Sequence, residues 1–328
     1  KLLSKTPRKY RFLLKSTEKT LENQQIRKFA FFGKDVDFYD VGDDKKQSIE
    51  KIKWGAIDFN FHIFALVFEN KENISYNIKE KGEFFLDLMS EKTLLKGELV
   101  YTKKNYDRLM ELGSQLDLSV DFGIFGILAV PILRMLQFFY KYIPNYGIAI
   151  ILLTLLIRFV TFPLQYKSFK SMKKMQKIQP ELTKLKEKFK DDPQRMQKET
   201  MELFKREGAN PLGGCLPMLL QLPIFLALYR VLYAAVELVG APFYGWISDL
   251  SLKDPYFVLP ILMAITMFLQ QKMTPTATTD ATQQKVMMFM PLIFGFIMKD
   301  LPSGLVLYIC VSTIFGVAQQ LFVYRVTD

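Results

Sequence analysis

The sequence predicts a membrane α-helical bundle of five spans, with an N-terminal all-β external domain and a cytoplasmic α-helical hairpin. Three observations lead to this fold class. Long apolar stretches occur only after Gly123, whereas shorter stretches with apolar–polar alternation precede it. More than half of the net charge of +11 lies in residues 165–208. Apolar stretches of about 20 residues suit bilayer crossings, whereas alternation suits strands.

Residues 1–118 have the pattern of a water-soluble antiparallel β-sandwich. Strands are expected in the stretches 36–39, 57–68 and 83–89, which are rich in Phe, Ile and Val. Residues 99–116 are expected to form a short closing helix. The single histidine, His62, falls on the polar face of a strand, where a solvated side chain is far more common than a functional one.

Five apolar stretches are expected to cross the bilayer, near 147–164, 212–236, 255–271, 286–298 and 303–323. The first, second and last reach the usual crossing length of about 20 residues. The third and fourth are shorter. We interpret them as short spans because they alternate with long ones and have polar loops on both sides; buried or re-entrant segments are the alternative. Short spans imply local thinning of the bilayer.

Residues 119–142 are expected to form an interfacial amphipathic helix. Arg134, Gln137 and Lys141 are separated by three and four residues, so their polar groups share one helical face. A sixth span is the alternative, and it would place the β domain on the cytoplasmic side.

Lys and Arg determine the expected orientation of residues 143–328, the membrane domain. The loop 165–208 contains 13 basic and 7 acidic residues. Cytoplasmic loops carry an excess of Lys and Arg, so this loop should face the cytoplasm. Five crossings then place the β domain outside and the C-terminus inside. Because the β domain must be translocated, we expect a signal anchor upstream of Lys1.

The same basic loop has the pattern of an αα-hairpin. Apolar residues recur every three or four positions from Phe169 to Phe189, and Pro180 is a candidate break in this first arm. In the turn, Asp192 would cap the second arm and Pro193 would occupy its first position. A simple anchor on anionic lipid is the alternative role. The site residues expected in the hairpin are Lys173, Lys174, Lys177, Asp191, Asp192 and Pro193.

Polar side chains form stripes along the spans. Thr154, Arg158 and Thr161 share one helical face, and no span interior contains Asp or Glu. Polar groups in hydrocarbon face a cavity or each other, so we expect a hydrophilic groove open to the cytoplasm. An arginine that snorkels to the headgroups is the alternative for Arg158. The expected groove residues are Arg158, Thr154, Thr161, Gln221, Thr266, Gln270, Ser312, Gln319 and Gln320.

The composition excludes several functional classes. With two cysteines, Cys215 and Cys310, and one histidine, the chain lacks the residues for a Cys-based zinc site, a His metal cage or a catalytic triad. We expect no catalytic residue, metal or cofactor, and therefore not an enzyme. A small-solute or ion transporter that uses the intramembrane arginine is the alternative function. Against it, no intramembrane carboxylate is available for ion coupling.

Several motifs occur in order along the membrane half. They are Asn210-Pro211-Leu212-Gly213-Gly214-Cys215-Leu216-Pro217, Gln221-Leu222-Pro223, Asp254-Pro255-Tyr256, Gln271-Lys272-Met273, Met290-Pro291 and Pro302-Ser303-Gly304-Leu305. These motifs resemble the YidC/Oxa/Alb family of membrane protein insertases, in its bacterial Gram-negative form with an external β domain.

The resemblance implies an insertase and chaperone of the bacterial inner membrane, which inserts hydrophobic segments of nascent proteins alone or with the Sec translocon. Arg158 corresponds to the family's groove arginine, and Thr154 to the polar residue one turn before it. Tyr308 corresponds to a substrate-contacting region, whereas Ile309 stands where many members have a second aromatic residue. Residues 1–118 correspond to an incomplete periplasmic supersandwich-like domain, and 119–142 to the family's interfacial helix.

The expected partners also follow from the resemblance. They are nascent single-span membrane proteins with acidic tails, the Sec translocon, the ribosome and anionic lipid. The sequence ends without the family's basic C-terminal tail, so we expect ribosome contact to be weak.

Overall fold

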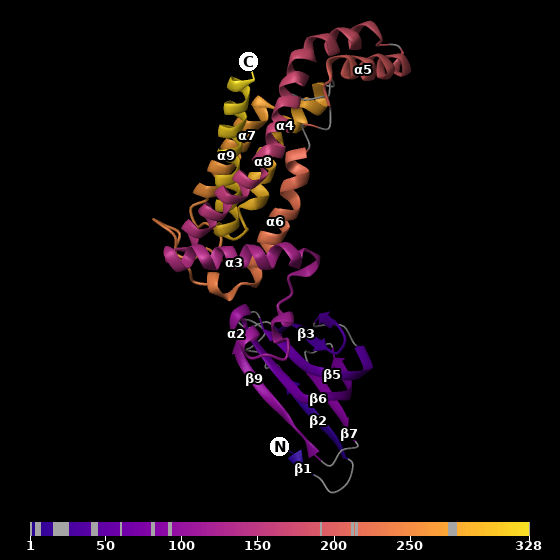
Figure 1. Cartoon of the computed structure of the whole chain (residues 1–328), viewed down its shortest axis with the longest axis vertical. Coiled ribbons are helices and arrows are strands. Elements are labelled where there is room, and N and C mark those ends of the chain that lie inside the picture. Colours follow the sequence, from indigo (N-terminus) through magenta and orange to yellow (C-terminus); the bar gives the residue numbers. More distant parts are fainter. Residues whose placement is uncertain are drawn as a thin grey trace. The chain divides into compact units, whose positions relative to one another are not determined.

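The computed structural model of the chain contains two compact units, which we describe separately. One comprises Lys1–Asp121 with Ala234–Val236, and the other comprises Phe122–Tyr233 with Glu237–Asp328. The first is built mainly from strands and the second from helices (Figure 1). The structure describes residues 2–3, 8–15, 26–40, 45–59, 61–79, 83–90, 94–190, 192–210, 213, 216–274 and 281–327.

The first unit is built on an antiparallel seven-stranded sheet. A second, two-stranded sheet is formed by β1 (Leu2–Leu3) and β8 (Leu94–Leu95). The all-β class is therefore as predicted for this region, whereas a supersandwich-like arrangement remains a prediction. The large sheet runs in the order β2 (Arg8–Lys15), β7 (Glu83–Ser90), β6 (His62–Lys79), β5 (Lys45–Phe59), β3 (Ile26–Phe32) and β4 (Val36–Asp40), and β9 (Gly97–Lys103) pairs with the beginning of β6.

The sheet buries large apolar side chains at its centre, among them Phe29, Trp54 and Ile63. The indole nitrogen of Trp54 donates to the carbonyl oxygen of Ser114 at 3.0 Å, which ties the segment after α2 (Tyr106–Glu111) to the sheet. A buried ion pair of 2.6 Å joins Lys104 to Asp58. These contacts fasten the end of the β region to its core.

Two predictions for this unit were wrong. The stretch 57–68 is not one strand: β5 ends at Phe59, β6 begins at His62, and the two pair as a hairpin with Ile57 opposite Phe64. The apolar–polar alternation continues from β5 into β6, so the pattern alone does not separate the two strands. The predicted helix 99–116 is also mostly absent, because β-forming residues at 99–102 pair with β6 and only Tyr106–Glu111 is α-helical.

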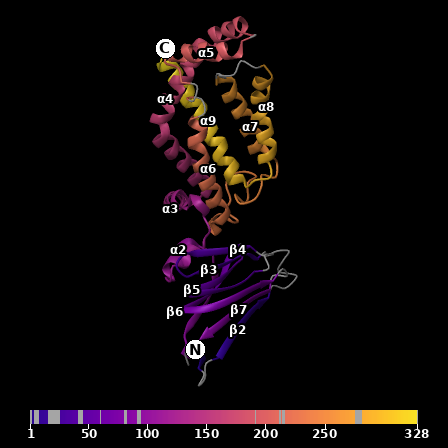
Figure 2. The same ribbon diagram turned by 90° about the vertical axis from the view of Figure 1, so that its right-hand side faces the viewer.

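The second unit contains the apolar helices. The longest, α4 and α9, pack against each other, and α7 packs against both α8 and α9 (Figure 2). The helices are α3 (Gly126–Tyr142), α4 (Tyr146–Lys188), α5 (Pro193–Glu207), α6 (Leu216–Ala234), α7 (Val258–Met273), α8 (Ala281–Met298) and α9 (Ser303–Val326), with the 3-10 turn η2 (Gly123–Phe125). The 3-10 turn η1 (Leu116–Ser119) belongs to the first unit, and η4 (Val236–Leu238) begins at the last residue of that unit.

Each predicted span falls on a helix, but the number of crossings remains a prediction. By length and composition, three helices are able to cross a membrane: Gly123–Tyr142, Tyr146–Leu185 and Ser303–Val326. Three further apolar helices are shorter, namely Leu219–Ala234, Val258–Met273 and Lys285–Met298. The length of α3 is therefore compatible both with an interfacial helix and with a membrane span. The direction of α3 relative to the other helices helps to decide between the two. In Figure 1, α3 lies crosswise to α4 and α9.

The first predicted span and the first hairpin arm form one continuous helix. α4 runs for 43 residues and contains Pro163 and Pro180, so the candidate break at Pro180 was wrong. A proline removes one backbone hydrogen bond from a helix. Here the helix is held on both sides of that position, because Ile178 and Leu182 are buried against α5.

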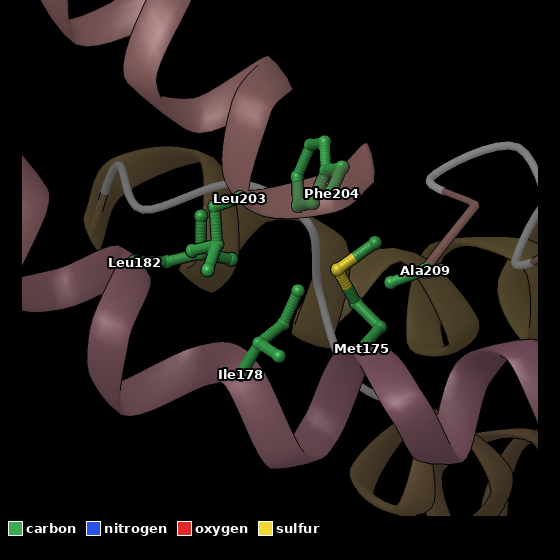
Figure 3. Packing of buried hydrophobic residues seen from close by; sticks show 6 residues of the cluster. All are labelled: Met175, Ile178, Leu182, Leu203, Phe204 and Ala209. Atoms are coloured by element: carbon green, nitrogen blue, oxygen red, sulfur yellow. The ribbon is translucent and has the colours of Figure 1, made fainter. Parts of the chain in front are cut away.

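The hairpin itself is as the pattern predicted. α4 and α5 pack through six buried residues, shown in Figure 3: Met175, Ile178, Leu182, Leu203, Phe204 and Ala209. The Asp192 side chain accepts from the Arg195 backbone nitrogen at 3.0 Å, and Pro193 begins α5. Asp191 lies outside the described residues. Further back on α4, Phe169 and Met172 pack on Val323 of α9, so one apolar stripe serves two contacts.

Leu182→Ala should loosen the hairpin without disturbing the rest of the membrane unit. Truncating a buried leucine costs about 2–5 kcal/mol because it leaves a cavity. We expect faster hydrogen exchange in α5 and in the matching part of α4, measured by mass spectrometry in detergent. Lys184→Ala, at an exposed position two residues on, is the control. Equal exchange in both variants would contradict this packing.

Candidate functional site

Arg158 of α4 is the centre of a buried polar network. Its Nε and Nη2 donate to the hydroxyl oxygen of Ser312 at 3.0 and 2.6 Å, and its Nη1 donates to Gln165 Oε1 at 3.2 Å. Arg158 is 9% exposed, and Ser312 and Gln165 are each 3% exposed. Within the described part of the chain, these acceptors are neutral and no carboxylate pairs with Arg158. The guanidinium is therefore hydrogen-bonded, but its charge is not compensated.

The network continues along α4 and across to α9. Gln165 Nε2 donates to the Thr161 hydroxyl at 3.0 Å, and that hydroxyl donates to the Ile157 carbonyl at 2.8 Å. From α9, Gln319 Nε2 donates to the carbonyl oxygen of Arg158 at 3.3 Å. Both the side chain and the backbone of Arg158 are thus bonded to α9, which fixes the guanidinium relative to that helix.

The remaining helices also contribute polar groups to this region. Gln221 of α6 donates through Nε2 to the hydroxyl of Tyr308, which lies one turn before Ser312 on α9. Thr266 of α7 lies 3.2 Å from the Thr313 hydroxyl of α9. Gln270, one turn further along α7, approaches α9 at Gly316, where a Cβ atom would be only 3.0 Å from Gln270 Nε2. Helices α4, α6, α7 and α9 therefore contribute polar side chains to one continuous region around Arg158, which we call the polar seam.

Two of the expected groove residues have other contacts. The Thr154 hydroxyl is fully buried and donates to Ile150 of its own helix at 2.6 Å. Gln320 donates to the Met273 carbonyl at 3.2 Å and to the Tyr324 hydroxyl at 3.1 Å, which joins the end of α7 to α9. The structure does not bring either side chain to the guanidinium.

Three residues of the seam were absent from the expected groove set: Gln165, Thr313 and Gly316. Gln165 lies seven positions after Arg158, on the same helical face. It was assigned to the hairpin because the apolar run ends at residue 164. Gly316 follows Ser312 by one turn, and the continuing four-residue spacing was the available signal.

The three lysines expected as site residues of the hairpin differ in their contacts. Lys173 Nζ donates to the Tyr324 carbonyl at 2.6 Å, where it satisfies an acceptor in the last turn of α9. Lys174 Nζ lies 3.4 Å from the Gly208 carbonyl. Lys177 is exposed and has no hydrogen bond or ion pair to any described residue. Of the three, Lys177 is the most available to a partner.

The glycine-rich motif after α5 is fastened to α4. Ser168 donates to the Gly213 carbonyl, and Ser171 exchanges hydrogen bonds with the backbone of Asn210 at 3.1 and 3.2 Å. A Cβ atom at Gly213 would lie 2.7 Å from the side chain of Ser171, so the close approach requires glycine. This contact sets where α6 begins relative to α4.

Two further motifs, at 254–256 and 302–305, fix the starts of α7 and α9. Asp254 is buried, and its carboxylate accepts from Trp246 Nε1 at 2.9 Å and from the Leu259 backbone at 2.8 Å. Ser303 and Gly304 donate through their backbone nitrogens to carbonyls of the α6–α7 connection at 2.7 and 2.9 Å. These contacts fix where α7 and α9 begin, and therefore where their polar residues lie along each helix axis.

Elsewhere, a cleft of about 520 Å³ lies between the hairpin arms. Its lining includes Glu181, Lys184 and Arg206, so charges of both signs surround it. Among the described residues, no group of three or more His, Cys, Asp or Glu side chains could hold a metal ion.

The family described as 60Kd inner membrane protein matches residues 138–328 of this chain. Proteins named membrane protein insertase YidC are similar as well. That of Citrifermentans bemidjiense is 50% identical over 225 residues, which are 69% of this chain and 42% of the relative. That of Wolinella succinogenes is 48% identical over 255 residues, which are 78% of this chain and 47% of the relative. That of Haemophilus influenzae is 41% identical over 305 residues, which are 89% of this chain and 56% of the relative.

The chain spans about half the length of the curated relatives that it matches. Among solved structures, it resembles a crystal structure of an active YidC insertase with its first transmembrane domain resolved. The TM-score is 0.53 at 20% identity, and the match covers 88% of this chain and 82% of that one. The likeness to this crystal structure shows the fold alone.

Ser312→Ala should destabilise the protein more than Thr154→Val. Loss of the Ser312 hydroxyl leaves buried guanidinium donors without an acceptor, at a cost of about 1–3 kcal/mol. The Thr154 hydroxyl bonds only within its helix, and such a bond contributes little. Thermal unfolding in detergent would measure both, with the exposed Ser248→Ala as control. A larger effect at Thr154 would show that the network is not the stabilising contact.

Proposed function

The chain belongs to the 60Kd inner membrane protein family, and on this premise we propose that it is a membrane protein insertase and chaperone. It would transfer hydrophobic segments of nascent proteins into the bacterial inner membrane through a groove open to the cytoplasm. The observation that carries the proposal is the charge of Arg158, held inside the helical unit by neutral acceptors alone among the described residues.

The proposed topology has five spans, α4, α6, α7, α8 and α9, with the hairpin in the cytoplasm and the β unit in the periplasm. The 13 basic residues of 165–208 support this orientation. An interfacial α3 is supported by its crosswise direction and by its exposed apolar residues, such as Ile127 at 87% and Phe138 at 52%.

The depth of Arg158 fits a groove in the cytoplasmic half of the membrane. It lies twelve residues after the start of α4, which is about 18 Å at 1.5 Å per residue. A charge at that depth needs water or polar groups around it. Two amide oxygens, Gln319 Oε1 and Gln320 Oε1, are buried without a hydrogen-bond partner in the described part of the chain. Water in a groove would satisfy them.

The charge would act on the polar end of the substrate. An acidic N-terminal tail enters from the cytoplasm and is attracted to Arg158, because opposite charges interact more strongly in a partly buried groove than in bulk water. The membrane potential then favours outward movement of the tail by about 2.3 kcal/mol per charge per 100 mV. The short helices α7 and α8 favour a locally thin bilayer, which shortens the remaining distance.

The apolar segment of the substrate would leave sideways into lipid. Its transfer from water is favourable by roughly 25 cal/mol per Å² of apolar surface. The hairpin would receive the segment first. Its exposed cations, including Lys177, would contact anionic lipid and partners such as the Sec translocon and the ribosome.

A transporter that uses Arg158 is the second candidate, since an intramembrane arginine also suits anion transport. Helices α6, α7, α8 and α9 contain no Asp or Glu that could couple a proton or cation to transport. This lack of coupling groups favours the insertase.

Arg158→Ala should impair insertion of a single-span protein with an acidic tail more than insertion of the same protein with Asn and Gln in the tail. Loss of one charge-assisted interaction predicts about a tenfold difference between the two substrates. Protease protection of the tail in proteoliposomes is the measurement. Arg230→Ala removes the same charge from an exposed position on α6 and serves as the control.

Equal loss for both tails would contradict the electrostatic role while keeping the insertase. If the unmodified protein inserts neither substrate better than empty vesicles do, the insertase proposal fails. Solute and ion flux through the same vesicles would then test the transporter.

A further inference from the structure

The connection between α6 and α7 contains an aromatic turn that is fixed by its own contacts. The Phe243 backbone nitrogen donates to the Ile247 carbonyl oxygen at 3.0 Å, which closes the turn. The Phe243 ring packs on Gly147 at the start of α4, where a Cβ atom would collide with that ring. The side chains of Tyr244 and Trp246 are thereby held at the surface, and Trp246 is 41% exposed.

The polar group of Trp246 is satisfied inside the protein. Its Nε1–H donates to Asp254 Oδ1 at 2.9 Å, and the same buried carboxylate accepts from the backbone nitrogens of Tyr256 and Leu259 at 3.0 and 2.8 Å. An indole has one N–H donor and no other polar group. The exposed part of Trp246 is therefore a purely apolar surface, held beside the start of α7 by Asp254.

This ring adjoins a larger apolar surface at the start of α7. Its exposed residues are Tyr256, Phe257, Val258, Ile261, Leu262 and Ile265. The last four are separated by three or four positions and therefore share one face of the helix. An exposed apolar surface of this extent is typical of a contact with lipid or with another protein.

The conformation of Phe257 favours lipid over water. Its φ of 57° lies in the left-handed region, where a bulky side chain strains the backbone. Phe257 is also the N-cap of α7 and makes no side-chain cap hydrogen bond. In water, a short polar residue is strongly preferred at this position. An exposed phenyl ring instead suits a helix start that is surrounded by hydrocarbon.

Charged residues lie beside this apolar surface. Lys253 Nζ lies 3.6 Å from Asp300, and Lys299 Nζ lies 2.8 Å from the same carboxylate. Lys299 Nζ is also 5.2 Å from the centroid of the exposed Phe296 ring at the end of α8. Lysines at a membrane edge cover apolar surface with their stems and keep the ammonium among the headgroups. The two lysines therefore mark the level of the headgroups.

The length of α7 leaves room for these rings in the membrane. Its 16 residues span about 24 Å at 1.5 Å per residue, whereas the hydrocarbon core is about 30 Å thick. Aromatic rings at its start add apolar height at that end. This end lies opposite to the hairpin in the helical unit (Figure 2), so the proposed topology places it in the outer leaflet.

We propose that the α6–α7 connection is a membrane-binding element, which places the rings of Trp246 and Phe257 among the acyl chains of the outer leaflet. Asp254 is a positioning residue. By accepting the indole N–H, it removes the need for water or a headgroup that keeps an interfacial tryptophan at the membrane surface. The inference rests on the topology of the proposed function, and its test does not require insertase activity.

Fluorescence quenching tests this lipid contact, because the chain has only two tryptophans. The other, Trp54, is fully buried in the β unit. The emission of Trp246 is the difference between the unmodified protein and Trp246→Phe in vesicles of phosphatidylcholine. We expect most of this emission to be lost when the lipid carries bromine in the upper part of its acyl chains, and little to be lost to iodide in the water.

Two results would overturn the lipid contact. Quenching by iodide without quenching by brominated lipid would show that the ring lies in water. Quenching by neither would show that protein covers the ring. Expected quenching in vesicles that insert no substrate would contradict the insertase function alone, whereas insertion without lipid quenching would contradict this inference alone.

The role of Asp254 is tested by the depth of the indole ring. In Asp254→Ala the indole N–H has lost its acceptor, so the ring should move toward the headgroups. Quenching should then shift from lipids brominated along the acyl chain to lipids brominated next to the headgroup. Asp254→Asn retains an acceptor oxygen and should restore the original depth.

Asp249→Ala is the matched control for this shift. Asp249 lies in the same connection, and its carboxylate accepts from the backbone nitrogen and hydroxyl of Ser251. Its removal should leave the depth of the indole ring unchanged. The same depth in Asp254→Ala and the unmodified protein would overturn the positioning role of Asp254, and so would an equal shift in Asp249→Ala.

Discussion

The helical unit depends on one constraint: a positive charge buried between α4 and α9 must be hydrogen-bonded without being neutralised. Ser312 and Gln165 accept from Arg158, Gln319 bonds its backbone, and all three are neutral. A carboxylate in their place would have cancelled the charge of the guanidinium. Neutral acceptors keep the guanidinium fixed and still attractive to an anion.

Motifs away from Arg158 fix the positions of the helices that surround it. Ser168 and Ser171 fasten the glycine-rich connection before α6, Asp254 fixes the start of α7, and Gly304 fixes the start of α9. Small residues allow the close approaches, since a side chain at Gly213 or Gly316 would meet a neighbouring helix. The first arm of the charged hairpin continues the same long helix that carries Arg158, so the proposed site of substrate capture and the buried charge lie on one helix.

The spacing of polar residues along the sequence predicts which side of a helix is polar, but it does not predict which residues that side contacts. The spacing of Thr154, Arg158 and Thr161 predicted a polar face on α4, and the cap at Asp192 predicted the hairpin turn. A helical face does not reveal its partner, so Thr154 was grouped with Arg158 although its hydroxyl bonds to Ile150. Gln165 was overlooked because hydropathy ended the span where the helix continues. In the β unit, the same alternation runs through the end of β5 and the beginning of β6, so it does not reveal that they are two strands.

The most direct test of the uncompensated charge is its reversal. In Arg158→Glu, the Ser312 hydroxyl and the Gln165 amide can turn from acceptors into donors, so the network tolerates the opposite sign. Insertion of acidic and basic tails would be compared in proteoliposomes without a membrane potential. Arg158→Glu is expected to lose insertion of acidic tails and to gain insertion of basic ones. The same tail preference in Arg158→Glu and the unmodified protein would contradict it.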